Sequence, residues 1–174
     1  MALFYPTMYR RRITDITVED LHTLGVQGIL LDIDNTLTTH DNPVLDESVS
    51  AWLSQMREAG FALTVVSNNS ERRVSPFAEA IGLHYQARAA KPLPRGYRAA
   101  AVSMGLAVDQ CVAVGDQIFT DILGANLAGM KSVLLEPIAM EVEQKFIVFK
   151  RRLERVLLNT RRAKRRREED YRYA

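Results

Sequence analysis

Two carboxylic acids, Asp32 and Asp34, stand one residue apart at the end of an apolar run, and they are the first candidates for chemistry in this sequence. In an extended chain, residues two apart face the same side, so both carboxylates enter one pocket. Their repulsion favours one ionised and one protonated acid unless a cation intervenes, which supplies a nucleophile and a proton donor. Asp and Asn are also common in turns at strand ends. The pair alone leaves both interpretations open.

Three further polar clusters also follow apolar runs. The hydroxyl of Ser67 and the backbone N–H groups around Asn68 suit phosphate oxygens, and Lys91 can neutralise a phosphate and an attacking carboxylate together. Asp116 offers the hard oxygen ligand that Mg²⁺ prefers. Asp121 fits the same cluster, or the first turn of a helix, where a carboxylate complements the helix dipole. Each cluster alone also has an ordinary explanation, as a turn, a solvated lysine or a helix start.

The elements that must position these clusters alternate between strands and helices. Helical spacing of apolar residues separates short apolar runs, and this alternation implies a parallel sheet with right-handed crossovers in a three-layer α/β domain. Ligands of such sheets bind beyond the carboxyl ends of the strands, where all four polar clusters are expected. The predicted strands cover 28–33, 62–66, 85–87, 111–114 and 132–135.

Four stretches of the chain, LDIDNTL, VVSNNS, AAKP and GDQIFTDILGANLAGMKSVLL, resemble the motifs of the haloacid dehalogenase-like (HAD) superfamily of phosphatases. The resemblance covers roughly residues 25–136, with all motifs in order. In detail, the residues of these stretches are similar to those of the YqeG family of subfamily IIIA. This family is related to the phosphatidylglycerophosphate phosphatases of mitochondria and plastids. The resemblance implies a three-layer, Rossmann-like HAD fold with a central parallel sheet.

The same resemblance implies the catalytic roles. Asp32 would attack phosphorus and form an aspartyl phosphate, while Asp34 would act as general acid and then general base. Mg²⁺ would be held by Asp32, the backbone carbonyl of Asp34, and Asp116.

Phosphate-binding roles are implied for the two central motifs. Ser67, Asn68 and Lys91 would hold the oxygens of the transferring phosphoryl group, where charge stabilisation is the main task. Asp121 is expected just outside the metal ligands, supporting them.

The short spacing between the motifs leaves no room for a cap domain. Each of the intervals from Asp34 to Ser67 and from Ser67 to Lys91 is filled by one helix and one strand. An uncapped site favours a bulky substrate, or one that another subunit or a membrane covers.

Charge divides the 174-residue chain into an acidic HAD-like domain at 1–144 and a basic amphipathic tail at 145–174. The overall net charge is +2, but the tail alone holds 12 of the 23 Lys and Arg residues and 4 of the 21 Asp and Glu residues. Its apolar stripe, which includes Phe146, Leu153 and Leu157, and its arginines suit a membrane surface. An arginine run is also typical of RNA binding, and the stripe is equally compatible with packing on the sheet.

Composition narrows the class of protein. The single cysteine excludes an intrachain disulfide and a cysteine metal cluster, and we expect a cytoplasmic protein that can associate peripherally with the inner face of the membrane. The sequence predicts a Mg²⁺-dependent phosphomonoester phosphatase, with phosphatidylglycerophosphate or another bulky substrate as candidates. The alternatives are a soluble nucleotide or sugar phosphatase, and a non-enzymatic HAD scaffold whose tail binds RNA or ribosomes. Nucleic acid is the less favoured partner, and no oligomeric state is predicted.

Overall fold

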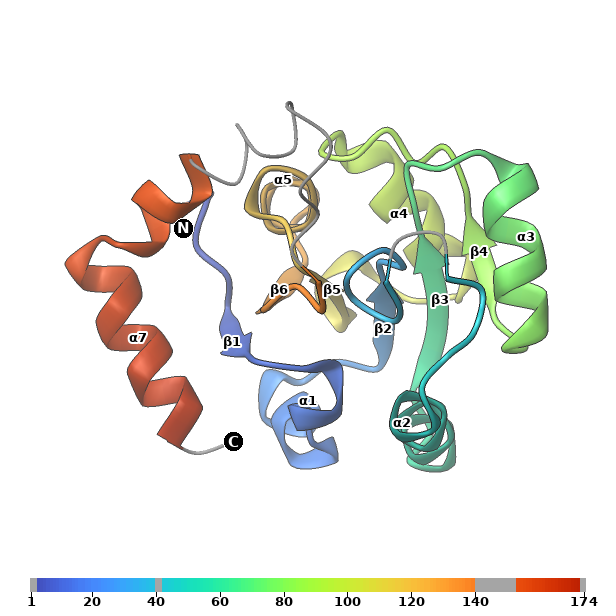
Figure 1. The fold of residues 1–174 in the computed structure, drawn as a ribbon. Helices are drawn as coiled ribbons and strands as arrows, with labels where there is room; N and C mark the ends of the chain where they lie inside the picture. Colours follow the sequence, from blue (N-terminus) through green and yellow to red (C-terminus); the bar gives the residue numbers. More distant parts are fainter. Residues whose placement is uncertain (1–2, 40–41, 140–152, 173–174) are drawn as a thin grey trace.

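The fold is a parallel six-stranded sheet with helices on both faces (Figure 1). This computed structural model describes residues 3–39, 42–139 and 153–172. The strand order is β1-β6-β5-β2-β3-β4, and every neighbouring pair is parallel. The strands are β1 (Met8–Arg10), β2 (Gly28–Leu31), β3 (Ala62–Val66), β4 (His84–Gln86), β5 (Cys111–Gly115) and β6 (Lys131–Leu135).

Helices α1 to α5 connect successive strands across the two faces of the sheet, and α7 follows the last strand. They are α1 (Val18–Leu24), α2 (Glu47–Glu58), α3 (Glu71–Ala80), α4 (Pro94–Ser103), α5 (Leu123–Ala128) and α7 (Arg161–Arg172). A helix over 153–158 precedes α7. Short 3₁₀ turns lie at Ile13–Asp15 and Val108–Gln110, and a π-helical turn at Ile118–Ile122 leads into α5.

Strand β2 shows why the central strands are apolar at consecutive positions. Ile29 and Leu31 enter a core cluster with side chains of α1, α2 and α3, whereas Leu30 enters a second cluster with side chains of α4 and α5. In Figure 1, α1 and α2 lie below the sheet and α4 and α5 above it. A strand buried on both faces has no polar side, as parallel sheets require. The predicted three-layer α/β fold is confirmed.

The edge strand β1 was not predicted. It pairs with β6, with Met8 opposite Val133, and its Arg10 side chain is buried. The Arg10 guanidinium is neutralised by two contacts to the carboxylate of Asp20 in α1, at 2.5 and 3.2 Å. Strand β1 has three residues and one of them is an arginine, so it lacks the apolar run by which the other strands were identified. The arginine can be buried because a carboxylate of another element neutralises its charge.

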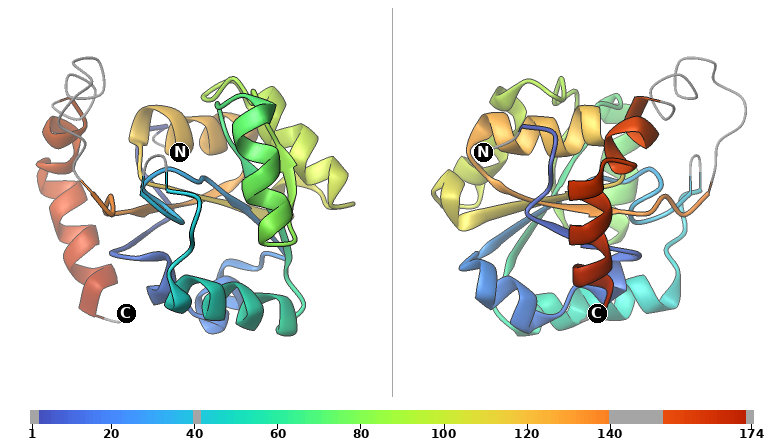
Figure 2. Two further views of the ribbon diagram at one scale, coloured as in Figure 1. Left: turned by 45° about the vertical axis from the view of Figure 1, so that its right-hand side comes forward. Right: turned by 90° about the vertical axis from the view of Figure 1, so that its left-hand side faces the viewer.

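The described part of the basic tail lies along the β1 edge of the sheet (Figures 1 and 2). The backbone N–H of Tyr9 donates to Asp170 Oδ2 at 2.9 Å, and the side chain of Tyr171 packs with Ile118 and Leu134. Leu158 joins the same cluster. These contacts favour packing of the apolar stripe on the sheet, one of the three alternatives that the sequence left open.

The rest of the predicted tail consists of residues that are not described and of residues that are, some of them exposed. Residues 145–152, and with them Phe146 and the predicted boundary at 144, lie outside the described residues. Leu153 and Val156 are exposed, at 44% and 67%. Across the described ranges, no helix combines the length and the hydropathy that crossing a bilayer requires.

Candidate active site

The four predicted clusters meet at the carboxyl edge of the sheet. Asp32 follows β2, Ser67 follows β3, Lys91 lies in the loop after β4 and Asp116 follows β5. Strands β2 and β5 are direct neighbours, and the backbone N–H of Asp32 donates to the carbonyl of Val114 at 3.0 Å. The parallel register therefore places the first and last clusters side by side, as expected for strands whose carboxyl ends share an edge.

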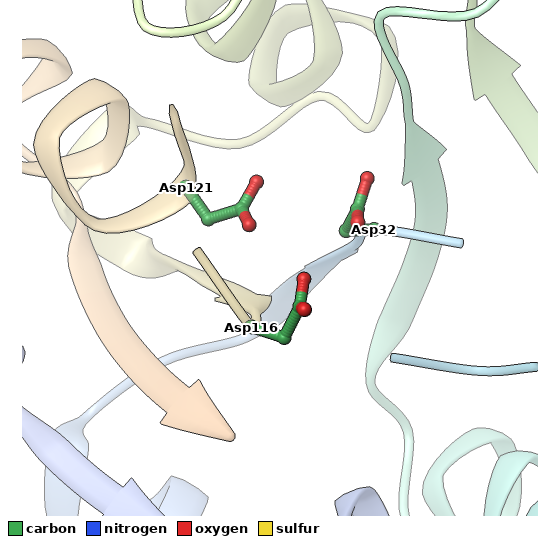
Figure 3. A group of neighbouring side chains, drawn as sticks. All are labelled: Asp32, Asp116 and Asp121. Atoms are coloured by element: carbon green, nitrogen blue, oxygen red, sulfur yellow. The ribbon is translucent and has the colours of Figure 1, made fainter. Parts of the chain in front are cut away.

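Three carboxylates converge at this edge (Figure 3). One carboxylate oxygen from each of Asp32, Asp116 and Asp121 lies within 4.8 Å of the other two. All three residues are buried, with exposed fractions of 8%, 3% and 2%. Buried acids at this spacing repel one another strongly, so the arrangement requires cations close by.

Lys91 supplies one of these cations. Its Nζ lies 2.5 Å from Asp32 Oδ1 and 2.7 Å from Asp121 Oδ1. Burial lowers the pKa of Lys91, but the charges of Asp121 and Asp32 outweigh this effect and raise that pKa well above its ordinary value. The amine is therefore an ammonium ion at neutral pH, bridging the β2 loop and the turn before α5.

Among the described side chains, the Lys91 ammonium contacts two of these three carboxylates. The pKa of Asp32 is raised to about 8: burial is the largest cause, the Lys91 charge acts in the opposite direction, and the charges of Asp121 and Asp116 add to the rise. The site thus retains a proton, or binds another cation, near neutral pH. A set of carboxylate oxygens fits a hard divalent ion such as Mg²⁺, which binds through one or two carboxylates together with substrate phosphate.

The carboxylate of Asp34 lies outside this cluster. Asn69 Nδ2 donates to Asp34 Oδ2 at 2.7 Å, and an Arg73 guanidinium nitrogen lies 2.5 Å from Asp34 Oδ1. The carboxylate cluster is completed instead by Asp121, the residue expected to support the ligands from outside. A metal-binding role for the backbone carbonyl of Asp34 stays a prediction.

Arg73 was missed in the sequence. It lies in the first turn of α3, next to the similar residue Arg72, and no local pattern distinguishes the two. The fold makes the distinction, because α3 begins immediately after the β3 loop and turns Arg73 towards Asp34, whereas Arg72 is exposed.

The Asn68 side chain holds the Lys91 loop in place. Its Oδ1 accepts from the backbone N–H of Lys91 at 2.6 Å, and its Nδ2 donates to the Lys91 carbonyl at 3.1 Å. The buried Ser67 hydroxyl accepts from the backbone N–H of Asn69 at 3.1 Å. Both polar residues thus order the two loops that approach Asp32. Direct phosphate binding by Ser67, Asn68 and Lys91 stays a prediction.

Asp121 is placed by the π-helical turn that precedes α5. Its Oδ2 accepts from the backbone N–H of Gln117 at 3.1 Å, and the Tyr97 hydroxyl donates to the carbonyl of Thr120 at 3.0 Å. A Cβ at Gly115 would collide with the Asp121 carboxylate. The space beside Gly115 is filled by Asp121. Single π-helical turns recur at functional sites because they redirect one side chain.

The chain is similar in sequence to known proteins. Residues 39–129 match the family model described as "Hydrolase: haloacid dehalogenase-like hydrolase". The chain is 38% identical over 157 residues to the "Probable phosphatase YqeG" of Bacillus subtilis (strain 168), with 90% of each chain covered.

Two solved structures have similar folds. An uncharacterized protein from Listeria monocytogenes serotype 4b has a TM-score of 0.57 at 19% identity, with 68% of this chain and 84% of that one covered. The cobalt-bound deoxy-D-mannose-octulosonate 8-phosphate phosphatase from Haemophilus influenzae has a TM-score of 0.52 at 9% identity, with 84% of this chain and 92% of that one covered. At these identities the likeness concerns the fold.

Proposed function

Because this chain belongs to the haloacid dehalogenase-like hydrolase family, we propose that it is a phosphatase that cleaves phosphomonoesters through an aspartyl phosphate on Asp32. The observation that carries the proposal is the convergence of Asp32, Asp116 and Asp121 around the ammonium of Lys91. A buried carboxylate beside a fixed cation, at the ligand-binding edge of the sheet, is placed to attack an anionic phosphoryl group.

In the first half of the reaction, a carboxylate oxygen of Asp32 bonds to phosphorus and the bond from phosphorus to the ester oxygen breaks. The electron pair of that bond leaves with the alcohol oxygen, which takes a proton from Asp34. The Lys91 ammonium stabilises the negative charge on the phosphoryl oxygens during the transfer. The Lys91 ammonium lies 2.5 Å from Asp32, so its positive charge lies where phosphorus must approach.

In the second half, a water molecule attacks the phosphorus of the aspartyl phosphate and gives a proton to Asp34. The bond from phosphorus to the Asp32 oxygen breaks, which releases inorganic phosphate and restores the carboxylate. Asp34 thus returns to its starting protonation state. The contacts from Asn69 and Arg73 hold its carboxyl group in one orientation for both proton transfers.

A divalent ion, with Mg²⁺ as the candidate, would be held by Asp32, Asp116 and Asp121. When bound, it would offset the repulsion between the attacking carboxylate and the phosphate dianion. The fit rests on donor type and spacing, since three carboxylate oxygens within 4.8 Å of one another suit a hard divalent ion. The structural relative from Haemophilus influenzae is likewise a metal-bound phosphatase.

The test is an Asp32→Asn variant assayed with p-nitrophenyl phosphate, with Asp109→Asn at an exposed position as the control. The asparagine keeps the side-chain volume but is no nucleophile, so we expect turnover to disappear while the melting temperature stays within the range of a folded domain. Wild-type protein quenched in acid during turnover and reduced with borohydride should carry homoserine at position 32. Substantial hydrolysis by Asp32→Asn would contradict the covalent mechanism.

For the substrate, we propose a bulky phosphomonoester such as phosphatidylglycerophosphate. The interval between Asp34 and Ser67 holds only α2 and β3, and that between Ser67 and Lys91 only α3 and β4, apart from their loops and residues 40–41, which are not described. This supports an uncapped site that leaves room for a large alcohol. The exposed side chains of Leu153 and Val156, next to the arginines of the tail, support contact with an anionic bilayer.

A panel of phosphorylated lipids, nucleotides and sugars, each assayed with Mg²⁺, tests this choice. We expect the highest kcat/KM for a vesicle-borne phospholipid phosphate. Faster hydrolysis of nucleotides or sugar phosphates would instead favour the soluble metabolic phosphatase. Absence of hydrolysis across the whole panel would favour the non-enzymatic scaffold.

A further inference from the structure

A cavity opens beside the candidate active site. It has a volume of about 150 Å³ and lies between the C-terminal segment, residues 153–172, and the carboxyl ends of β1, β5 and β6. Asp116, one of the three clustered carboxylates, lines it. The cavity therefore shares one residue with the place where a phosphoryl group would be held.

The cavity is lined by apolar side chains and by two arginines. Ile118, Leu134 and Leu158 supply apolar surface, and Arg155 and Arg167 supply positive charge. Among the side chains that the structure describes, neither arginine forms an ion pair. By contrast, Arg165, which lies on α7 together with Arg167, pairs with Glu169 at 2.9 Å. The two arginines of the cavity thus have charge available for an anion.

Besides Asp116, two carboxylates line the cavity, and each accepts a hydrogen bond from a neutral donor. Glu136 accepts from the Tyr171 hydroxyl at 3.0 Å, and the buried Glu154 accepts from the backbone N–H of Phe119 at 3.3 Å. Through Glu154 the helix over 153–158 is attached directly to the π-helical turn that follows Asp116. The cavity is consequently shaped by fixed contacts between the tail and the catalytic edge of the sheet.

The far wall is held in the same way. The Arg11 guanidinium lies 5.1 Å from the centre of the Tyr171 ring, a cation–π contact, and Asp170 accepts from the Tyr9 backbone. Helix α7 therefore presents Arg167 and Tyr171 to the cavity from a defined position on the sheet edge.

We propose that this cavity is a subsite for the alcohol part of the substrate, and that it binds an apolar segment carrying a second anionic group, such as another phosphate. The inference rests on the proposed phosphatase function. Arg155 and Arg167 would bind the second anion while Asp32 attacks the first, because guanidinium groups form paired, charge-assisted hydrogen bonds with phosphate. The C-terminal segment would then select the substrate, a task that a cap domain performs in other phosphatases.

Kinetics with two matched esters test the subsite. Butane-1,4-diol bisphosphate and butyl phosphate share the same carbon chain, and only the first carries a second anion. We expect wild-type protein to prefer the bisphosphate, and Arg155→Ala or Arg167→Ala to lower the ratio of its kcat/KM to that of butyl phosphate by about tenfold or more, the loss of a charge-assisted hydrogen bond. Arg167→Lys should recover part of the ratio.

Arg165→Ala is the matched control, since its side chain is 84% exposed on the same helix. It should leave the ratio unchanged. If Arg155→Ala and Arg167→Ala lower both kcat/KM values equally, or if Arg165→Ala lowers the ratio as much as they do, the subsite is refuted.

A binding measurement separates this inference from the proposed function. The probe is butane-1,4-bisphosphonate, which is not hydrolysed, titrated calorimetrically into full-length protein. A loss of affinity in the Arg155→Ala and Arg167→Ala variants but not in Arg165→Ala supports the subsite even if no ester is turned over. Equal affinities in all variants overturn it even if the protein is an active phosphatase.

Two vesicle assays identify the source of the second anion. Phosphatidylglycerophosphate carries a phosphodiester beside its phosphomonoester, and phosphatidic acid carries the monoester alone. A preference for the first that Arg167→Ala abolishes supports a lipid headgroup in the subsite. A preference that appears only with the soluble bisphosphate supports a soluble substrate.

Discussion

Arg73 and Asp34 lie 39 residues apart in the chain, and their side chains form an ion pair of 2.5 Å at the entrance of the candidate active site. The Asp34 side chain is 19% exposed and that of Arg73 is 30% exposed, so the pair lies at the border with solvent. Together with Asn69, Arg73 determines where the carboxyl group of Asp34 points. Asp34 is the residue to which we assign both proton transfers, so its orientation matters for the reaction.

Arg73→Gln should therefore impair catalysis through Asp34. A mispositioned general acid loses part of a contribution of roughly 10²–10⁴-fold, and we expect kcat for an alkyl phosphate to fall by about tenfold or more. Hydrolysis of p-nitrophenyl phosphate should fall less, because its leaving group needs little protonation. Arg73→Lys should restore part of the difference, and Arg72→Gln at the exposed neighbouring position should have no effect. An equal loss with both esters would show that Arg73 does not act through the acid.

Gly115→Ala should displace Asp121, because the added Cβ would collide with the Asp121 carboxylate. Overpacking of this kind costs about 1–3 kcal/mol, and we expect a loss of that size in the free energy of unfolding measured in urea. A double-mutant cycle identifies the partner: in an Asp121→Gly background, which removes all of the colliding Asp121 side-chain atoms, Gly115→Ala should cost much less. Additive losses would mean that the glycine is needed for another reason.

Mg²⁺ should bind more tightly as the pH rises towards 8. The pKa of Asp32 is about 8 in the folded protein against an ordinary value of 3.8. Between these values the folded state binds more protons than the unfolded one, so the unfolding free energy of metal-free protein falls as the pH rises. Binding of the cation requires the carboxylate and releases this proton.

The rise in melting temperature on adding Mg²⁺ should consequently be larger at about pH 8.5 than at about pH 6, by comparison with samples in EDTA. Calorimetry in buffers of different ionisation enthalpy should detect the released proton at the lower pH. A Mg²⁺ affinity that stays constant over this range would contradict the assignment of Asp32 as a ligand.

Asp170→Ala should destabilise the fold by weakening the attachment of α7 to the sheet edge. The Asp170 carboxylate accepts from the Tyr9 backbone N–H at 2.9 Å, at a partly buried position on the sheet edge. Leaving a buried donor without its acceptor costs about 1–3 kcal/mol, measured as the free energy of unfolding. Glu168→Ala, at an exposed position of the same helix, should change stability by less than about 0.5 kcal/mol. Equal effects would mean that α7 does not depend on this contact.

The positions of Asp32, Ser67, Lys91 and Asp116 were predictable because each follows a strand. Apolar runs are local features, and a parallel sheet brings the ends of such runs together without further information. The five predicted strands are present, each within two residues of the predicted bounds.

Other parts of the site depend on geometry that has no local pattern. Asp121 joins the carboxylate cluster because a π-helical turn precedes α5, whereas helical spacing predicted a helix starting at about Thr120. Arg73 differs from Arg72 only in the direction in which α3 turns it. Arg155 and Arg167 are members of an arginine-rich segment, and only the docking of that segment shows which of its arginines face the cavity.

The pairing of β1 with both β6 and α7 also affects when the protein can fold. Tyr9 bonds to Asp170, 161 residues further along the chain, and Met8 pairs with Val133. A nascent chain leaves the ribosome from its N-terminus, so residues 8–10 wait unpaired until β6 emerges, and their outer edge waits until residues 161–172 emerge. The pairing of β3 with β2 and with β4 needs no such delay, because these three strands follow one another in the chain. Among these contacts, the last to become possible is a long-range one, of the kind that slows folding, and it is made by a helix that covers the sheet edge only after all six strands have been made.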